Sequence, residues 1–312
     1  MKITRENARE ICMLEFKNLE IEDKEIINQY LKIDQKRNSE SSFTNFYMWR
    51  KSYYVKYAVF EDNLIVRCGK DGEWWYLPPY GAGDWTKAIE EMMATVAEMG
   101  VPFQLKAVGE QDKIKIESLF PEKFDFTAER ENFDYIYDAE SLRTLAGRKL
   151  HAKRNHLNHF LQNENYTYEP LCADNLTAAA DYLEKWCAEK ACDSAEHTLD
   201  EMLVCEREAI HEIFNVYDKL DCEGALIRIN GAVQAFTLGE MINNDTVLIH
   251  VEKAEHEIRG LYPAINQMFL SHAFPNAVWV NREEDTGDEG LRQAKLSYLP
   301  AELWTKYKGV LR

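Results

Sequence analysis

The clearest structural signal in this 312-residue chain lies in residues 225–251, which read ALIRINGAVQAFTLGEMINNDTVLIHV. Two strand-like runs, at 225–229 and 232–241, flank Asn230-Gly231, the pair that a type I′ hairpin turn prefers. Asn243 and Asn244 mark a second turn before another strand-like run at 245–251. The sequence therefore predicts a β-hairpin followed at once by a third strand.

The two halves of the chain repeat one order of elements. In the second half, apolar spacing predicts helices over 175–189 and 199–218, the hairpin and third strand, then a helix over 261–274, a strand over 277–281, a helix over 289–296 and a strand over 303–307. The first half has strands within 54–69 and over 73–77, a helix over 85–99, a strand over 103–108, a helix over 111–119 and a strand over 133–137. Both halves thus contain a hairpin, a third strand, a helix, a strand, a helix and a strand.

This order resembles the GNAT acyltransferase fold, in which the third strand splays from its neighbour and the next helix offers its N-terminus to a ligand. The resemblance implies an α+β (mixed α/β) chain of two tandem GNAT-like domains, each a mixed, mostly antiparallel sheet flanked by helices. A length of 312 residues agrees with two domains of roughly 150 residues each. We expect these domains at residues 1–140 and 141–312, with the functional site in the second.

Composition narrows the class of protein. A net charge of −17 argues against a general nucleic-acid coat, and 46% apolar residues are typical of a globular chain. No run approaches the roughly 18 apolar residues of a spanning helix, and residues 1–10 lack the apolar core of a signal peptide. Seven scattered cysteines without a C-x-x-C pair favour neither disulfides nor a metal site. We therefore expect a cytoplasmic protein without stable membrane insertion, metal or tightly bound cofactor.

One basic segment departs from the acidic average. Residues 141–160 contain five lysines and arginines, three histidines and no acid, although acids outnumber bases 54 to 37 in the whole chain. If residues 150–161 form a helix, Lys149, Lys153 and Arg154 can neutralise the phosphates of a tRNA acceptor end or of CoA. The alternative is an ordinary solvated cationic helix.

Three segments resemble the bacterial family related to the C-terminal domain of phosphatidylglycerol lysyltransferase. They are residues 42–49 (SFTNFYMW), 147–160 (GRKLHAKRNHLNHF) and 281–300 (NREEDTGDEGLRQAKLSYLP). The resemblance implies a tandem GNAT arrangement like that of the peptidoglycan-building aminoacyl transferases, in which aminoacyl-tRNA replaces acyl-CoA as the donor. The membrane helices that precede this domain in the lysyltransferase are not found in this sequence, so we expect a soluble acceptor such as a peptide, an amino acid or a cell-wall precursor.

A loop after the third strand is the place where GNAT acetyltransferases grip a pyrophosphate with an R/Q-x-x-G-x-G/A motif. The matching residues 257–262 read EIRGLY, so only Gly260 fits, with Arg259 and the following helix N-terminus as further support for a phosphate. Glu257 opposes a phosphate, and Pro263 removes a donor amide. Binding of CoA or acetyl-CoA as a co-substrate is therefore the alternative, and Gly260 relieving a tight turn is the structural interpretation.

The segment from Asn281 onward is the third candidate, because it starts where a predicted strand ends, and open α/β sheets tend to place their sites there. Asp285 or Glu284 can orient a substrate ammonium, and Tyr298 can act as an acid toward the leaving group, as the matching tyrosine does in many GNAT enzymes. Glu252 shares a strand face with His250 and can act as a base with it. The binding residues expected here are Arg282, Arg292 and Lys295. Pairing of Arg292 with Asp285 or Asp288, and a structural role for His250, are the alternatives.

Three functions remain open on these residues. The leading one is transfer of an aminoacyl group from aminoacyl-tRNA to a soluble amine or cell-wall-type acceptor. The second is a CoA-dependent N-acetyltransferase. The third is a non-catalytic GNAT-fold module that binds a small amine or a peptide.

Overall fold

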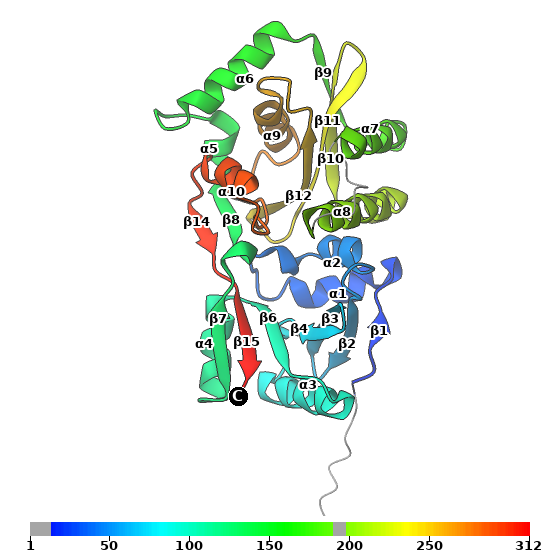
Figure 1. The fold of residues 1–312 in the computed structure, drawn as a ribbon, viewed down its shortest axis with the longest axis vertical. Coiled ribbons are helices and arrows are strands. Elements are labelled where there is room, and N and C mark those ends of the chain that lie inside the picture. Colours follow the sequence, from blue (N-terminus) through cyan, green and yellow to red (C-terminus); the bar gives the residue numbers. More distant parts are fainter. Residues whose placement is uncertain (1–13, 190–197) are drawn as a thin grey trace, which may run out of the picture.

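The computed structural model describes residues 14–189 and 198–312, without the side chains of 198–203, and residues 1–10, considered above for a signal peptide, lie outside it. Two mixed β-sheets, one above the other in Figure 1, are flanked by helices. The expected α+β class is therefore confirmed. None of the helices in the described parts of the chain combines the length and apolar content that a bilayer span requires.

The first sheet is antiparallel except at one pair of strands. Its order is β1 (Lys17–Asn18), β2 (Lys56–Phe60), β3 (Asn63–Lys70), β4 (Glu73–Tyr76), β6 (Gln104–Val108), β15 (Tyr307–Leu311) and β7 (Phe124–Ala128), with β5 (Tyr80–Gly81) on β3. The parallel strands β4 and β6 share one paired position, Tyr76 with Leu105. The described residues of the two strands share no other paired position.

The second sheet has the same design. Its order is β14 (Glu302–Trp304), β8 (Asp134–Asp138), β13 (Trp279–Asn281), β12 (Thr246–Ala254), β11 (Ala232–Met241), β10 (Glu223–Ile229) and β9 (Tyr166–Pro170). The hairpin β10–β11 is confirmed, and Asn230 and Gly231 have φ of 50° and 86°, the signs that a type I′ turn requires. Strand β12 pairs with β13 only over its first three residues, so its end from Ile249 onward is free on that side.

Each sheet receives a strand from the other half of the chain. The strand expected over 133–137 does form, as β8, but it lies between β13 and β14 rather than closing the first half, so that part of the prediction is wrong. The strand expected over 303–307 is two strands, and the second of them, β15, inserts between β6 and β7 of the first sheet (Figure 1). The division at residues 1–140 and 141–312 stays a prediction, and the exchanged strands tie its two parts together.

Helices cover both faces of each sheet and create three cores. The α-helices of the described residues are α1 (Lys24–Leu31), α2 (Phe43–Trp49), α3 (Trp85–Met99), α4 (Glu110–Leu119), α5 (Ala139–Thr144), α6 (His151–Asn163), α7 (Leu176–Glu189), α8 (Thr198–Asn215), α9 (Leu261–His272) and α10 (Glu289–Leu296). Helices α3 and α4 pack on one side of the first sheet, and α5, α6 and α9 pack on one side of the second. The third core joins α1 and α2 to α7 and α8, with residues of both sheets. The two halves therefore share apolar contacts as well as strands.

Candidate functional site

A cavity of about 1630 Å³ is lined by residues of both sheets and therefore of both halves of the chain. On the second-sheet side, Ile249, His250, Glu252 and Lys253 reach it from the free end of β12. On the first-sheet side it is lined by residues of α2, of β4 and of β6, including Phe46, Trp49, Trp75 and Lys106. The shared cavity thus lies beside the parts of β12 and β6 that follow their short parallel pairings with β13 and β4.

Arg282 is the centre of the second-sheet wall. Its Nη2 donates to Glu252 Oε1 at 2.8 Å, and Asn266 on α9 holds the other oxygen of Glu252 at 2.9 Å. Arg282 Nη1 is buried and has no hydrogen-bond partner within the described residues. The guanidinium lies 4.9 Å from the ring centroid of Tyr298, and Lys153 Nζ lies 4.2 Å from the same ring. Four residues expected from the sequence, from three separate segments, therefore come together on the cavity wall.

Burial shifts the pKa values of two of these residues. It raises the pKa of Tyr298 well above its usual value, although Arg282 acts in the opposite direction. The phenol therefore stays protonated at neutral pH and is able to donate a proton. Burial, followed by the charge of Arg282, lowers the pKa of Lys153. The ammonium of Lys153 is thus partly desolvated, which strengthens its attraction for an anionic group.

Asp285 and Arg292 form an anchor beside the cavity and do not line it. Asp285 is fully buried and accepts from Arg292 at 2.9 and 3.0 Å, from Arg130 at 3.0 Å and from Tyr135 at 2.6 Å. Despite burial, these donors and the Gly287 amide hold the pKa of Asp285 well below its usual range. The pairing of Arg292 with Asp285, the alternative raised above, is the one observed. The catalytic role expected of Asp285 has no support in this geometry, because its oxygens are already occupied.

Lys295 and Glu284 lie on the same loop but differ in what they contact. Lys295 Nζ donates to the backbone carbonyls of Arg282, at 2.6 Å, and of Glu284. Lys295 thereby fixes the loop backbone and also lines the cavity. The Glu284 side chain lines the cavity as well, with 30% of its surface exposed, and Lys306 Nζ lies 4.0 Å from its carboxylate.

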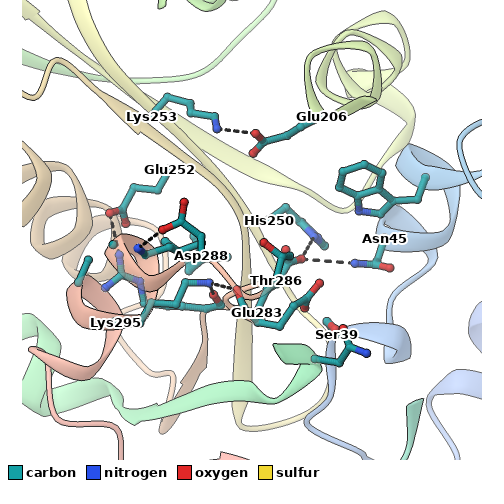
Figure 2. A pocket seen from close by; sticks show the side chains of 18 of the residues that line it. Ser39, Asn45, Glu206, His250, Glu252, Lys253, Glu283, Thr286, Asp288 and Lys295 are labelled. Carbon is teal, nitrogen blue, oxygen red and sulfur yellow. Dashed lines mark hydrogen bonds and ion pairs between the residues drawn. The ribbon is translucent and has the colours of Figure 1, made fainter. Parts of the chain in front are cut away.

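A buried polar network in the cavity wall was missed by sequence reasoning. His250 Nε2 lies 3.2 Å from Glu240 Oε1, and His250 Nδ1 lies 3.4 Å from Glu283 Oε1. Figure 2 shows Glu283 between His250 and Asn45 of α2, and Ser42 and Thr44 donate to Glu240. Burial disfavours the charged ring, but the hydrogen bonds to both glutamates outweigh it and raise the pKa of His250 to about 9. The resemblance in residues 42–49 singled out this helix without indicating its role.

The basic helix reaches the cavity with only part of its charge. Lys153 and His156 line the cavity, whereas Lys149 is exposed beside the helix start and lies outside the lining. Arg154 turns back and donates to the carbonyls of Leu145 and Gly147. Of the three cations expected to bind phosphates, therefore, one faces the cavity, one faces solvent and one holds the loop that precedes α6.

The loop considered as an alternative phosphate site packs closely against α6. Arg259 and Gly260 line the cavity at the N-terminus of α9. Gly260 has φ of 92°, and a Cβ added there would lie 2.0 Å from the carbonyl oxygen of His156. The close approach of the two backbones therefore accounts for this glycine without a ligand.

Gly260→Ala should destabilise the protein more than Gly147→Ala. Both positions have φ near 90°, where an added Cβ costs about 1–2 kcal/mol, but Gly147 has open space and Gly260 does not. The clash should add about 1–3 kcal/mol at Gly260. Urea unfolding of both variants measures the difference, and equal losses would show that α6 does not press on this loop.

Comparison with known proteins agrees with this architecture. A conserved protein of unknown function from Bacteroides thetaiotaomicron is 34% identical, with a TM-score of 0.90 over 96% of this chain and 100% of that chain. The C-terminal domain of a putative lysylphosphatidylglycerol synthetase from Agrobacterium fabrum is 14% identical, with a TM-score of 0.67 over 93% of this chain and 91% of that one. FemX is 11% identical, with a TM-score of 0.59 over 95% and 97%. The last two show the fold alone, and the tandem GNAT-like arrangement is confirmed.

A curated relative is more distant. An uncharacterized protein of Mycoplasmoides gallisepticum is 25% identical over 177 residues, which is 56% of this chain and 54% of that protein. The matched region thus spans about half the length of that relative. The family model described as phosphatidylglycerol lysyltransferase, C-terminal, matches residues 32–308, which include the whole second sheet, most of the first and every residue that lines the cavity. The chain therefore belongs to the family of the phosphatidylglycerol lysyltransferase C-terminal domain.

Proposed function

We propose that this protein is an acyltransferase that moves an aminoacyl group from aminoacyl-tRNA to an amine acceptor in the shared cavity. The observation that carries the proposal is the Arg282, Tyr298 and Lys153 group on the cavity wall, held in place by Glu252. Membership of the lysyltransferase family supports acyl transfer as the reaction class. A CoA donor has no comparable support, since Gly260 is explained by packing.

The wall residues match the needs of attack on an ester. Negative charge develops on the ester carbonyl oxygen, and a fixed donor nearby stabilises it more in the transition state than in the substrate. Arg282 is such a donor, because Glu252 fixes its orientation and its Nη1 has no partner in the described part of the chain. Tyr298, kept protonated by burial, is suited to protonate the leaving oxygen.

The donor would approach from the side of α6. Lys153 and Arg259 line the cavity, and Arg148 and Lys149 are exposed just before the helix. Positive charge is thus placed beside α6 in a chain of net charge −17, which favours a polyanion there.

A transfer assay tests this function. The protein is incubated with radiolabelled aminoacyl-tRNA or radiolabelled acetyl-CoA, with glycinamide or ethylamine as probe acceptors, and labelled amide is measured after mild alkali has released ester-bound label. We expect amide from aminoacyl-tRNA and none from acetyl-CoA. Arg282→Lys, which keeps the charge beside Glu252 but changes the donor geometry, should reduce the rate about 100-fold.

Arg228→Lys is the matched control, since Arg228 pairs with Glu169 away from the cavity. It should transfer at the wild-type rate. Transfer from acetyl-CoA alone would overturn the aminoacyl donor in favour of the acetyltransferase. Stabilisation of the protein by an amine without any transfer would instead support a non-catalytic binding module.

A further inference from the structure

We propose that Glu284 is the general base of this site, and that it takes a proton from the ammonium group of a strongly basic primary amine. This inference rests on the proposed function and names a catalytic residue and an acceptor class for it. The acceptor would be a lysine-like alkylamine rather than an alcohol, because an alcohol carries no positive charge for this carboxylate to recognise.

Glu284 differs from the neighbouring cavity carboxylates in being uncommitted. Glu252 is paired with Arg282, Glu206 with Lys253 and Glu283 with His250. The Glu284 carboxylate accepts no hydrogen bond within residues 14–189 and 198–312, and its ion pair with Lys306 Nζ, at 4.0 Å, is longer than a hydrogen bond. A carboxylate that is partly buried without a donor lacks full compensation for lost water, and a bound ammonium would supply it.

Several charged groups surround this carboxylate and decide its ionisation. Burial raises the pKa of Glu284 to about 7, Lys306 opposes this, and Glu283, Asp134 and Glu40 add to it. Lys295 of α10 also interacts with it electrostatically. A base that is about half ionised at neutral pH accepts a proton readily and still releases it after the reaction.

An aromatic wall of the same cavity also suits an alkylammonium group. Burial, followed by the charge of Glu284, raises the pKa of Tyr53 to about 12, so the two side chains interact electrostatically. The Tyr53 ring is 5.8 Å from Trp49 and 6.1 Å from Trp75, and all three line the cavity. Aromatic faces attract cations and bury methylene groups, so this wall fits an amine on an alkyl chain.

The base and the donor that activates the ester are held by one residue. Lys295 donates to the carbonyls of both Arg282 and Glu284, so the backbone positions of the two residues are fixed together. Both side chains line the same cavity. An amine deprotonated at Glu284 is therefore generated in the chamber where Arg282 would hold the ester carbonyl.

Glu284 removes one proton from R–NH₃⁺, and the nitrogen lone pair of R–NH₂ attacks the ester carbonyl carbon to form the C–N bond. The C–O bond to the ribose breaks, Tyr298 donates its proton to the leaving oxygen, and the proton lost from nitrogen restores the phenol. The products are an amide, a free tRNA hydroxyl and protonated Glu284, which returns its proton to water.

Glu284→Gln tests the base with two acceptors of different basicity. The amine of ethylamine, like that of lysine, has a pKa of about 10.4, whereas the α-amine of glycinamide has a pKa of about 8 and is largely neutral at pH 8.5. At pH 8.5 we expect the variant to lose about 100-fold in rate with ethylamine and less than about 10-fold with glycinamide. With ethylamine, the wild-type rate should rise with pH through about 7 and then level off, because Glu284 is ionised there. The variant depends on the neutral amine, so its rate should keep rising toward about pH 10 without this plateau.

Glu284→Asp should recover part of the ethylamine rate, and Glu302→Gln, the same change on an exposed residue of β14, should leave both rates unchanged. Equal losses with the two amines would overturn the role as a base. A second measurement does not depend on turnover, because ethylamine should raise the unfolding temperature of the wild type and not that of Glu284→Gln. If that shift appears without transfer, the ammonium site stands and the proposed function fails, and if both proteins shift equally, the inference fails.

Discussion

Lys306→Met is expected to lower the free energy of unfolding by about 3–5 kcal/mol, the usual result of removing one partner from a buried ion cluster. Lys306 is fully buried, and its Nζ contacts Asp134 at 2.8 Å, Glu40 at 2.7 Å and the Ser39 hydroxyl at 2.9 Å. Burial alone would lower the pKa of this lysine, but the surrounding carboxylates raise it, so the ammonium stays charged. Without the lysine, Asp134 is left buried without a cation.

This ion pair lies where the two exchanged strands cross. Asp134 begins β8, which enters the second sheet, and Lys306 immediately precedes β15, which enters the first. Urea unfolding measures the loss, and Lys308→Met is the control, because Lys308 lies on β15 without an ion pair among the described residues. A loss below about 1 kcal/mol for Lys306→Met would show that packing alone holds the crossing together.

The sequence was most informative where local signals decide the structure. Helix α3 begins and ends at the predicted residues because Asp84 caps its start and Gly100, with φ of 68°, ends it. The hairpin at Asn230-Gly231 follows equally from its turn residues. Strand exchange carries no such signal, because β8 and β15 have the same alternation whichever sheet they join. Their positions depend on buried pairs such as Lys306 with Asp134, which are 172 residues apart in the sequence (306 − 134).

Part of the candidate site could be predicted from local sequence, and the rest depends on contacts between distant segments. Arg282, Tyr298, Lys153 and Glu252 were expected from their segments, and the fold brings them to one wall. Local sequence did not separate Glu284 from Asp285, since two neighbouring carboxylates differ only in which way the backbone turns them. Asp285 contacts Arg130, Arg292 and Tyr135, whereas Glu284 lines the cavity. His250 looked structural from its apolar neighbours, and its acidic partners come from distant segments.

The contribution of His250 to stability should depend strongly on pH. The pKa of His250 is raised from about 6.5 in the unfolded chain to about 9 in the folded protein, so the folded state binds the proton more tightly. The stabilisation is therefore fully present below pH 6.5 and is lost as the pH rises through 9. A shift of this size corresponds to about 3 kcal/mol. His250→Gln removes the titrating group, so the wild-type advantage over this variant should be about 3 kcal/mol larger at pH 6 than at pH 10.

Urea unfolding of both proteins at pH 6, 8 and 10 checks this, because titrations common to the two proteins cancel in the difference. His151→Gln, the same change on the exposed side of α6, is the control. A pH-independent difference at His250 would mean that the ring is neutral between Glu240 and Glu283. Those two carboxylates belong to β11 and to the loop after β13, and they also accept from Ser42, Thr44 and Asn45 of the first half. The charge of His250 therefore helps to hold α2 against the wall of the cavity.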